Sequence, residues 1–311
     1  MALTISQIVA SSYNAVVAER KKPANQWEES AMIREMKRQG MVESIPGGPQ
    51  IEAPLDYRRN PGAEFNLLDL DPLVMGKTDV VTAAIYDPAQ VSIPVVWSKA
   101  DESKNPTENQ KINFVSNLLT NALASHDDLF EQNIFAVSNA AFLGLQTQIP
   151  DSGQGTVGGI NAAVELWWRH FTGTYAAAGT DLIAKMAIAF NTAQKGTGGQ
   201  GPSLIVSDAE TQGTFEGTQQ PLQRWVDSQD LKAGFKTLAY KSARYIYSQF
   251  GNNRIYFLSN KGVGLKYFEG AMRQKGDTQE INNAQGYRFF IHSMAQLIVT
   301  MKSRNAILTE V

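Results

Sequence analysis

Apolar side chains recur at helical spacing most clearly between residues 107 and 136. They form one stripe along the expected helix: Ile112, Val115, Leu118, Leu119, Ala122, Leu123, Leu129, Phe130 and Ile134. Asn105-Pro106 stands directly before this stretch, as is typical of a helix start. With about 30 residues the helix would be about 45 Å long, more than twice the usual length, so it needs neighbours along its whole extent.

Two shorter helices are predicted before it. Residues 3–20 carry apolar side chains at helical spacing and end at Lys21-Lys22-Pro23. A second helix is expected to start at Asn25 and to stop at Gly40, with one apolar face made by Met32, Ile33 and Met36. The pattern favours two ordinary surface helices. The alternative is an arm that packs on other subunits.

The segment 49–97 predicts a long two-armed hairpin with too little apolar content to form a core alone. Residues 80–86 are rich in strand formers, and Asp87-Pro88 is a turn signal. One apolar face follows from the alternation of Val91, Ile93, Val95 and Trp97. Pro94 within this strand indicates an edge position or a bulge.

The second half of the chain reads as a mixed α/β region after a glycine-rich stretch. Thr180 is expected to cap a helix, the run 203–207 to form a short buried strand, and Asp208 to cap the next helix. Further strands are expected at 233–247 and 254–258. Two C-terminal strands, 286–292 and 295–301, are expected to be separated by a short turn.

Composition narrows the function. The 311 residues are 43% hydrophobic, enough for a large buried core. A net charge of -2 argues against a function that consists mainly of binding the phosphate backbone of nucleic acid, because such proteins are usually strongly basic. The chain could still enclose nucleic acid. With no cysteine, disulfides and thiolate metal sites are excluded. We expect no secretory signal, no membrane span and no removed N-terminal segment.

Catalytic chemistry is not evident. The histidines, His126, His170 and His292, lack partners at metal-binding spacing, so each reads as a structural or surface residue. The run 195–203 superficially resembles a phosphate loop, but it follows a helix and precedes a strand, the wrong order for that motif.

The remaining polar clusters also show no pattern of a catalytic or binding site. The acidic residues Asp127-Asp128 and Asp69 with Asp71 read as solvated charges. Lys241 and Arg244, near Tyr245 and Tyr247, fit a sheet surface as well as a nucleic-acid contact. We therefore predict no catalytic, cofactor-binding or metal-binding residues and a protein that is not an enzyme.

The order of these segments resembles the major capsid proteins of tailed bacteriophages, which share the Johnson fold. The pieces that carry the resemblance are Trp27 in an N-terminal helix, Gly47-Gly48, Pro54-Leu55-Asp56-Tyr57 followed by Asn60, Thr82-Ala83-Ala84-Ile85-Tyr86, Asp101-Glu102-Ser103-Lys104-Asn105 before the long helix, the run from Pro202 to Asp208, Arg224, Gly234-Phe235, and Tyr256-Phe257-Leu258-Ser259-Asn260. No single piece is specific. Their order along most of the chain points to the family.

The resemblance implies an α+β Johnson fold with four parts. They are an N-terminal arm at 1–48, the E-loop hairpin and strands leading into the P-domain at 49–97, a P-domain with a long spine helix and C-terminal strands at 98–156 and 276–311, and an A-domain at 157–275. It also implies that the hairpin lies on the spine helix of a neighbouring subunit.

The same resemblance implies a structural function. The chain would self-assemble through hexamers and pentamers into an icosahedral or prolate head that encloses double-stranded DNA without sequence-specific binding. Its partners would be neighbouring capsid subunits, a portal, and scaffold or decoration proteins as further candidates. The protein would be made in the host cytoplasm and reside in the virion, with no cofactor, metal or membrane.

Two features depart from some relatives. Only about 45 residues precede the hairpin, which implies a separate scaffold protein or none. Some relatives form an isopeptide bond between an E-loop lysine and a P-domain asparagine. Lys77 and Asn305 are the matching residue types here, and we do not expect them to be linked.

Two other interpretations stay open. An encapsulin-like nanocompartment shell would use the same fold to hold a protein cargo. A more distant alternative is an enzyme or carbohydrate-binding module with an unrecognised site in the region 160–275.

Overall fold

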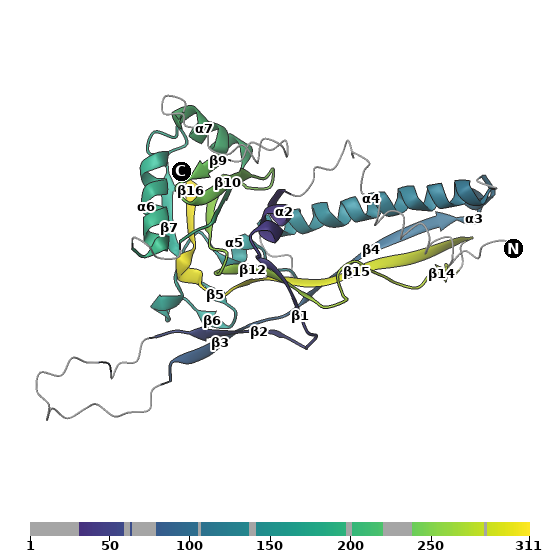
Figure 1. Ribbon diagram of the computed structural model, residues 1–311, viewed down its shortest axis with the longest axis horizontal. Helices are drawn as coiled ribbons and strands as arrows, with labels where there is room; N and C mark the ends of the chain where they lie inside the picture. Colours follow the sequence, from purple (N-terminus) through teal and green to yellow (C-terminus); the bar gives the residue numbers. More distant parts are fainter. Residues whose placement is uncertain are drawn as a thin grey trace, which may run out of the picture.

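The computed structural model describes residues 31–58, 63, 79–104, 107–136, 141–196, 201–219, 238–282 and 285–311. In this part of the chain there are two six-stranded sheets and two two-stranded hairpins, and a long helix lies along one of the six-stranded sheets (Figure 1). The predicted α+β class is confirmed.

The first sheet, here called the long sheet, is built around one 14-residue strand, β15. Its strands are β1 (Val42–Ile45), β4 (Ala89–Ser98), β12 (Val263–Phe268), β13 (Gln274–Lys275), β14 (Gln279–Glu280) and β15 (Gly286–Val299). β4 pairs with β15 on one side, and β12, β13 and β14 pair with its other side. β4 contains Pro94 and has β15 as its partner strand among the described residues, so the predicted edge position is confirmed.

The second sheet, here called the compact sheet, has the order β7-β16-β11-β8-β10-β9. Its strands are β7 (Phe171–Tyr175), β8 (Leu204–Ser207), β9 (Leu238–Tyr240), β10 (Ala243–Tyr247), β11 (Arg254–Leu258) and β16 (Ala306–Glu310). The helices α6 (Leu182–Gln194) and α7 (Ala209–Gln219) accompany it at one end of the molecule (Figure 1). All four residues of β8 are buried, as the run 203–207 predicted.

The predicted long helix is α4 (Glu108–Phe135), preceded by the short α3 (Lys99–Lys104). Its 28 residues correspond to about 42 Å. It runs along the β4–β15 part of the long sheet (Figure 1). Val115, Leu119 and Leu123 are buried from α4, and they pack with Trp97 and Ile291 from the sheet.

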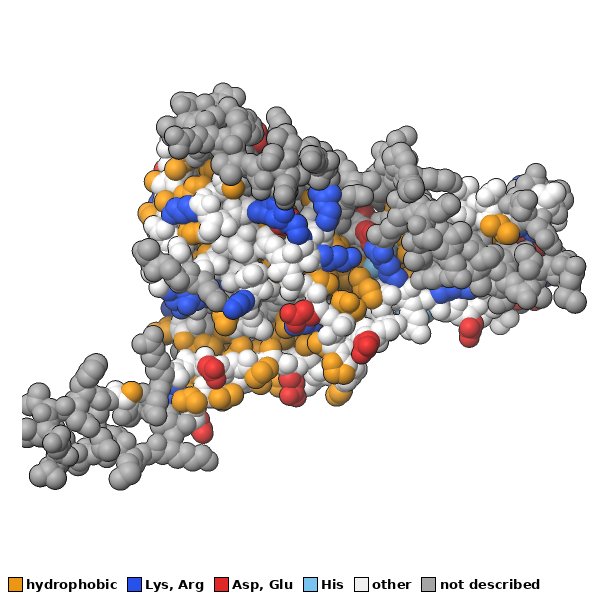
Figure 2. Space-filling model, in the orientation of Figure 1, with side chains coloured by type: hydrophobic (Ala, Val, Ile, Leu, Met, Phe, Trp, Pro, Cys, Tyr) orange, Lys and Arg blue, Asp and Glu red, His pale blue; other side chains and the backbone are white. Residues whose placement is uncertain are grey.

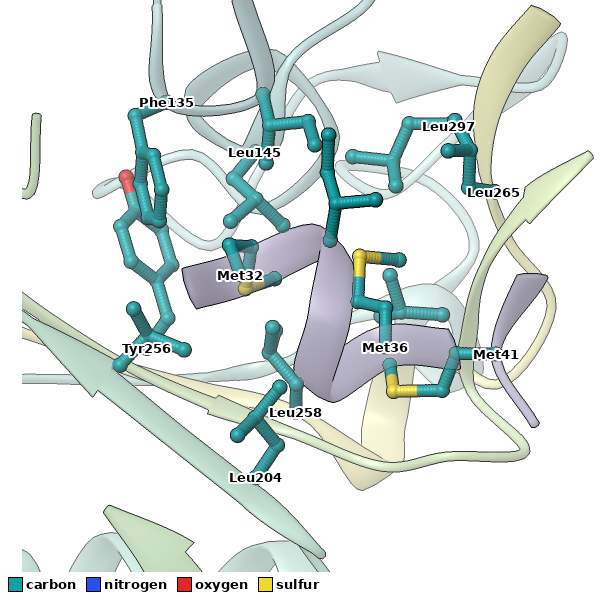
Figure 3. Packing of buried hydrophobic residues seen from close by; sticks show 14 of the residues in the cluster. Met32, Met36, Met41, Phe135, Leu145, Leu204, Tyr256, Leu258, Leu265 and Leu297 are labelled. Atoms are coloured by element: carbon teal, nitrogen blue, oxygen red, sulfur yellow. The ribbon is translucent and has the colours of Figure 1, made fainter. Parts of the chain in front are cut away.

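Helix α2 (Ala31–Arg38) is a core element. Met32 and Met36 are both 0% exposed, and they pack with Leu258 of the compact sheet and Leu297 of the long sheet (Figure 3). Neither the surface-helix prediction nor the arm alternative holds for this stretch, because apolar residues from distant parts of the chain enclose α2. The expected helix 3–20, the start at Asn25 and Trp27 lie outside the described residues.

The base of the predicted hairpin is present as β2 (Ile51–Asp56) paired antiparallel with β3 (Val81–Tyr86). Its inner face packs on the rest of the same chain: Ile51, Ala53, Leu55, Ala84 and Tyr86 contact a cluster that includes Trp168, Phe268 and Ile298. The segment was expected not to form a core alone, and this base is buried against other parts of the chain. The predicted extent of the hairpin needs correction, because residues 89–98 form β4 of the long sheet. Asn60 and Lys77 lie outside the described residues.

Three local predictions need correction. The C-terminal strands at 286–292 and 295–301 are one continuous strand, β15, because pairing with β4 runs through the expected turn at Ser293-Met294. Helix α6 starts after Asp181, not after Thr180. The final strand β16 pairs with β7 and β11 in the compact sheet, so residues 306–310 do not return to the P-domain as predicted.

The smaller elements complete the fold. They are α5 (Leu145–Gln148), β5 (Thr156–Val157), β6 (Ile160–Asn161) and the 3-10 turns η1 (Leu166–Trp168) and η4 (Lys302–Arg304). Asp208 caps α7 as predicted, since its carboxylate accepts a hydrogen bond from the Thr211 amide at 3.1 Å. Along the described stretches, no helix combines the length and apolarity that crossing a membrane requires.

Candidate assembly surfaces

The three histidines are placed separately, each with a local partner. Nε2 of His126 lies 2.8 Å from Ser293 Oγ, Nε2 of His170 lies 2.8 Å from the Pro150 carbonyl, and Nδ1 of His292 lies 2.8 Å from Ser92 Oγ. In the ranges that the structure describes, no group of acidic residues and histidines is arranged to hold a metal ion.

His126 belongs to a closed polar network that joins α4 to β15. Its Nδ1 lies 3.3 Å from Asp127 Oδ1, Asp127 pairs with the Arg273 guanidinium, and the Arg273 amide donates to Ser293 Oγ at 2.8 Å. The order serine, histidine, aspartate is that of a hydrolase triad. Both His126 and Ser293 are 0% exposed, however, so no substrate reaches them in this conformation. The arrangement is suited to holding the helix on the sheet.

A second buried polar pair lies where η4 meets the start of β7. Lys302 is 0% exposed, and its Nζ has no hydrogen-bond partner among the described residues. Burial lowers the pKa of Lys302 to about 8. Burial, and next the Lys302 charge, lower the pKa of His170 to about 4, and Nδ1 of His170 also has no partner in the described part. Sequence reasoning missed this pair, because the two residues lie far apart along the chain.

The basic and aromatic side chains singled out at 241–247 do not form one surface. Lys241 stacks over Phe190 at 5.0 Å, whereas Arg244 pairs with the buried Glu35 of α2 at 3.6 Å. Tyr245 is fully buried and Tyr247 is 51% exposed. The cluster therefore joins elements within the chain and does not present a nucleic-acid platform.

The remaining sequence candidates are equally unreactive or lie outside the described residues. Asn305 is 0% exposed, its amide oxygen accepts from the Ser259 amide at 2.9 Å, and its amide nitrogen donates to the Met301 carbonyl at 3.0 Å. An amide so engaged is not presented to a neighbour. Arg224, Gly234-Phe235, Asp69, Asp71 and residues 197–200 of the glycine-rich run fall outside the described part.

The outer face of the β2–β3 hairpin combines apolar and acidic side chains. The cross-strand pairs on this face are Glu52 with Ile85, Pro54 with Ala83, and Asp56 with Val81. Val81 is 60% exposed and Ile85 is 44% exposed. Figure 2 shows apolar side chains, with acidic ones among them, gathered along the lower edge of the molecule, where β2 and β3 lie in Figure 1.

The long sheet is covered unequally on the face opposite α4. At one end of β15, Met294 and Ile298 pack under the chain's own β2–β3 hairpin. Toward the other end, Arg288, Phe290 and His292 occupy the same face beside Pro94 and Val96 of β4. Val96 is 51% exposed, and Arg288 and Pro94 are exposed as well. We call this region the open face.

Comparison with known proteins gives a structural likeness without a sequence match. No protein-family model and no curated protein matches the sequence. The chain resembles the capsid of cyanophage A-1(L) with a TM-score of 0.66 and 15% identity, over 93% of its own length and 95% of that chain. It resembles the capsid of the native GTA particle with a TM-score of 0.60 and 10% identity, over 94% and 93% of the two chains.

The chain also resembles an encapsulin in structure. The chain resembles the encapsulin of the holo-SrpI complex from Synechococcus elongatus with a TM-score of 0.54 and 11% identity, over 99% of this chain and 96% of that one. At such low identities the comparison establishes the fold. The chain has the fold of phage capsid subunits and encapsulins, as its segment order predicted.

Proposed function

We propose that this chain is the major capsid protein of a tailed bacteriophage, a structural subunit that self-assembles into an icosahedral or prolate head around double-stranded DNA. The observation that carries the proposal is the likeness to a cyanophage capsid chain over 93% of the present one. Because the match covers 93% of this chain and 95% of the other, it supports the architecture of a whole shell subunit.

The described surface is consistent with a structural protein. Among the described residues, His126 and Ser293 of the Ser-His-Asp network are buried. Exposed apolar side chains such as Val81, Ile85 and Val96 lie on strands that a neighbouring subunit could cover. A net charge of -2 limits repulsion between many copies and enclosed DNA. We therefore propose a non-enzymatic role in which DNA is enclosed without sequence-specific contacts.

The proposed parts follow the order expected of a Johnson fold. We assign the arm to 1–48, the E-loop hairpin and its following strand to 49–97, the P-domain to 98–156 and 276–311, and the A-domain to 157–275. The described residues call for three changes to these proposed bounds. β16 (Ala306–Glu310) lies in the compact sheet, so we assign it to the A-domain. β12 and β13 lie in the long sheet, so we assign them to the P-domain, and α2 and β1 pack into the body, so we take them out of the arm.

The proposed partners are other copies of the chain, arranged as hexamers and pentamers, with a portal at one vertex. Scaffold and decoration proteins are further candidates. The protein would be synthesised in the host cytoplasm and end in the virion.

A second candidate is an encapsulin-like nanocompartment shell, favoured by the likeness to the encapsulin of the holo-SrpI complex. The two candidates differ in what the particle contains. Particles formed with the native partners should protect double-stranded DNA from nuclease if the chain is a phage capsid protein. A co-purifying protein cargo in place of DNA would favour the nanocompartment, and a chain that forms no particles would exclude both.

A further inference from the structure

The short link η4 connects the two sheets along the chain. Strand β15 of the long sheet ends at Val299, and strand β16 of the compact sheet begins at Ala306 (Figure 1). Between them lies η4 (Lys302–Arg304). A ligand held by a side chain of η4 would therefore sit at the joint between the sheets.

His170 reaches the same joint from the compact sheet. It directly precedes β7, and its Nε2 lies 2.8 Å from the Pro150 carbonyl oxygen. Pro150 follows α5 closely, and the Gln148 side-chain amide of α5 donates to the Leu297 carbonyl of β15 at 2.6 Å. The contact between His170 and Pro150 thus links the start of β7 to the long sheet.

The contact with Pro150 determines which nitrogen of His170 carries the proton. A carbonyl oxygen can only accept, so Nε2 is the N–H donor and Nδ1 of the neutral ring is an acceptor. Burial, and next the Lys302 charge, lower the pKa of His170 to about 4, so the ring is neutral at pH 7. Its Nδ1 is buried and has no hydrogen-bond partner in the described part of the chain.

Lys302 brings the complementary donor to this place. Its side chain is 0% exposed, and its Nζ has no partner among the described residues. With a pKa of about 8, the ammonium keeps most of its protons at pH 7. Its charge acts on His170, yet Nζ and Nδ1 are not hydrogen-bonded to each other. A buried donor and a buried acceptor therefore lie near each other, each without a partner.

The hydrogen-bonding requirements define the ligand at neutral pH. It must accept from the Lys302 ammonium and donate to Nδ1 of His170, and a water molecule does both. A halide could accept from Lys302 but has no hydrogen to donate to Nδ1. One water restores only part of the hydration that an exposed ammonium has, so the burial of Lys302 still costs stability.

Protonation of His170 changes what the same place can bind. Nδ1 then becomes a second N–H donor, so that Lys302 and His170 both present hydrogens and positive charge. The other charged groups here are Asp151, which acts on His170 from the turn after α5, and Arg254 of β11. Asp151 pairs with Arg254 at 2.8 Å, and no carboxylate pairs with Lys302 within the described ranges. A small anion would supply the missing negative charge.

We propose that Lys302 and His170 form a buried ligand site at the joint of the two sheets, which holds a water molecule at neutral pH and a small monovalent anion such as chloride in acid. The inference goes beyond the proposed function and holds whether or not the chain forms a shell. A ligand bound to both residues ties η4 to the start of β7.

The dependence of stability on chloride tests the anion state. Unfolding of the purified full-length chain is measured in sodium chloride and in sodium methanesulfonate of equal ionic strength, because methanesulfonate is too large for so small a site. At pH 4, about 0.3 M chloride should lower the unfolding equilibrium constant about fivefold, since it binds the folded chain with protonated His170. At pH 7 the two salts should give equal stability.

Two variants and a matched control assign the effect to this site. His170→Gln keeps a side-chain N–H for the Pro150 carbonyl but cannot gain a proton, so it should lose the chloride response at pH 4. Lys302→Met should lose it as well. Lys261→Met removes the charge of an exposed lysine and should keep the wild-type response. A response that persists in both His170→Gln and Lys302→Met would overturn the anion site.

Crystals of the full-length chain locate the ligand directly. At pH 7, a density peak should lie within about 2.7–3.2 Å of both Nζ of Lys302 and Nδ1 of His170. After soaking in sodium bromide at pH 4, an anomalous peak should appear at the same position. Direct contact between Nζ and Nδ1 with no peak between them, or bromide bound only elsewhere, would overturn the proposal.

Discussion

The two ends of strand β15 show the difference between a surface completed within one chain and a surface left for another. Near Val299 the strand is enclosed on both faces, by α2 on one side and by the β2–β3 hairpin on the other. Near Gly286 it has α4 on one face and the open face on the other. The same backbone pairing thus supports both a closed core and an exposed apolar surface, so strand pattern alone does not reveal which parts of a sheet a partner must cover.

The largest effect should come from removing a side chain at the enclosed end. Leu297 of β15 is 0% exposed and packs with α2, so Leu297→Ala should lower the free energy of unfolding of the unassembled subunit by about 2–5 kcal/mol. Denaturant titration measures this loss. A cost below about 1 kcal/mol would mean that this end is not the closed core described above.

The next largest effect is expected on the stability of the subunit at acidic pH. His170 is buried and its pKa is lowered to about 4, so the unfolded chain binds the proton more tightly than the folded one. The stability contribution is complete above about pH 6.5 and is lost as pH falls toward 4, by about 3 kcal/mol at most. Unfolding of wild type and His170→Gln at pH 7 and pH 5 measures it. An equal acid response in both proteins would contradict this role of His170.

A smaller gain is expected at the buried lysine beside it. Lys302 loses hydration without a hydrogen-bond partner in the described part of the chain, so Lys302→Met should raise the unfolding free energy at pH 7 by about 1–3 kcal/mol. The gain should shrink as pH rises from 8 toward 10.5, because wild-type Lys302 then loses its proton when folded. If Lys302→Met instead lowered the unfolding free energy, Lys302 would have a stabilising partner within the subunit, which would contradict this prediction.

The smallest effect on the subunit is expected at the open face. Val96 is 51% exposed, so Val96→Ser should change the unfolding free energy by no more than about 0.5 kcal/mol. The same substitution should reduce particle yield, since it removes apolar area that another copy would cover. Sedimentation of assembled and unassembled protein measures the effect on particle yield. If Val96→Ser destabilised the subunit as strongly as Leu297→Ala does, the proposed difference between the two ends of β15 would be contradicted.

Much of the fold followed from local periodicity. The stripe from Val115 to Ile134 predicted α4, the alternation through Trp97 predicted β4, and Asp208 predicted the cap of α7. These signals depend on residues close together in sequence, where side-chain direction is set by the helix or strand itself.

Most of the predictions that failed depended on contacts outside the local helix or strand pattern. Ser293 looked like part of a turn, but its hydroxyl contacts His126 inside the core, so the strand continues. Asp181, not Thr180, precedes α6, and its carboxylate accepts from the Ala176 amide, a contact outside the helix. The burial of Met36 in α2 depends on Leu258 and Leu297, more than 200 residues away. The open face could not be predicted from the sequence either, because its residues come together only when β4 and β15 pair.

Electron microscopy of the purified full-length chain, expressed alone and with its native partners, tests the central claim most directly. We predict closed particles of uniform size built from repeating units of this chain. A protein that stays monomeric and folded under every assembly condition, with no particles or sheets, would contradict its role as a shell subunit.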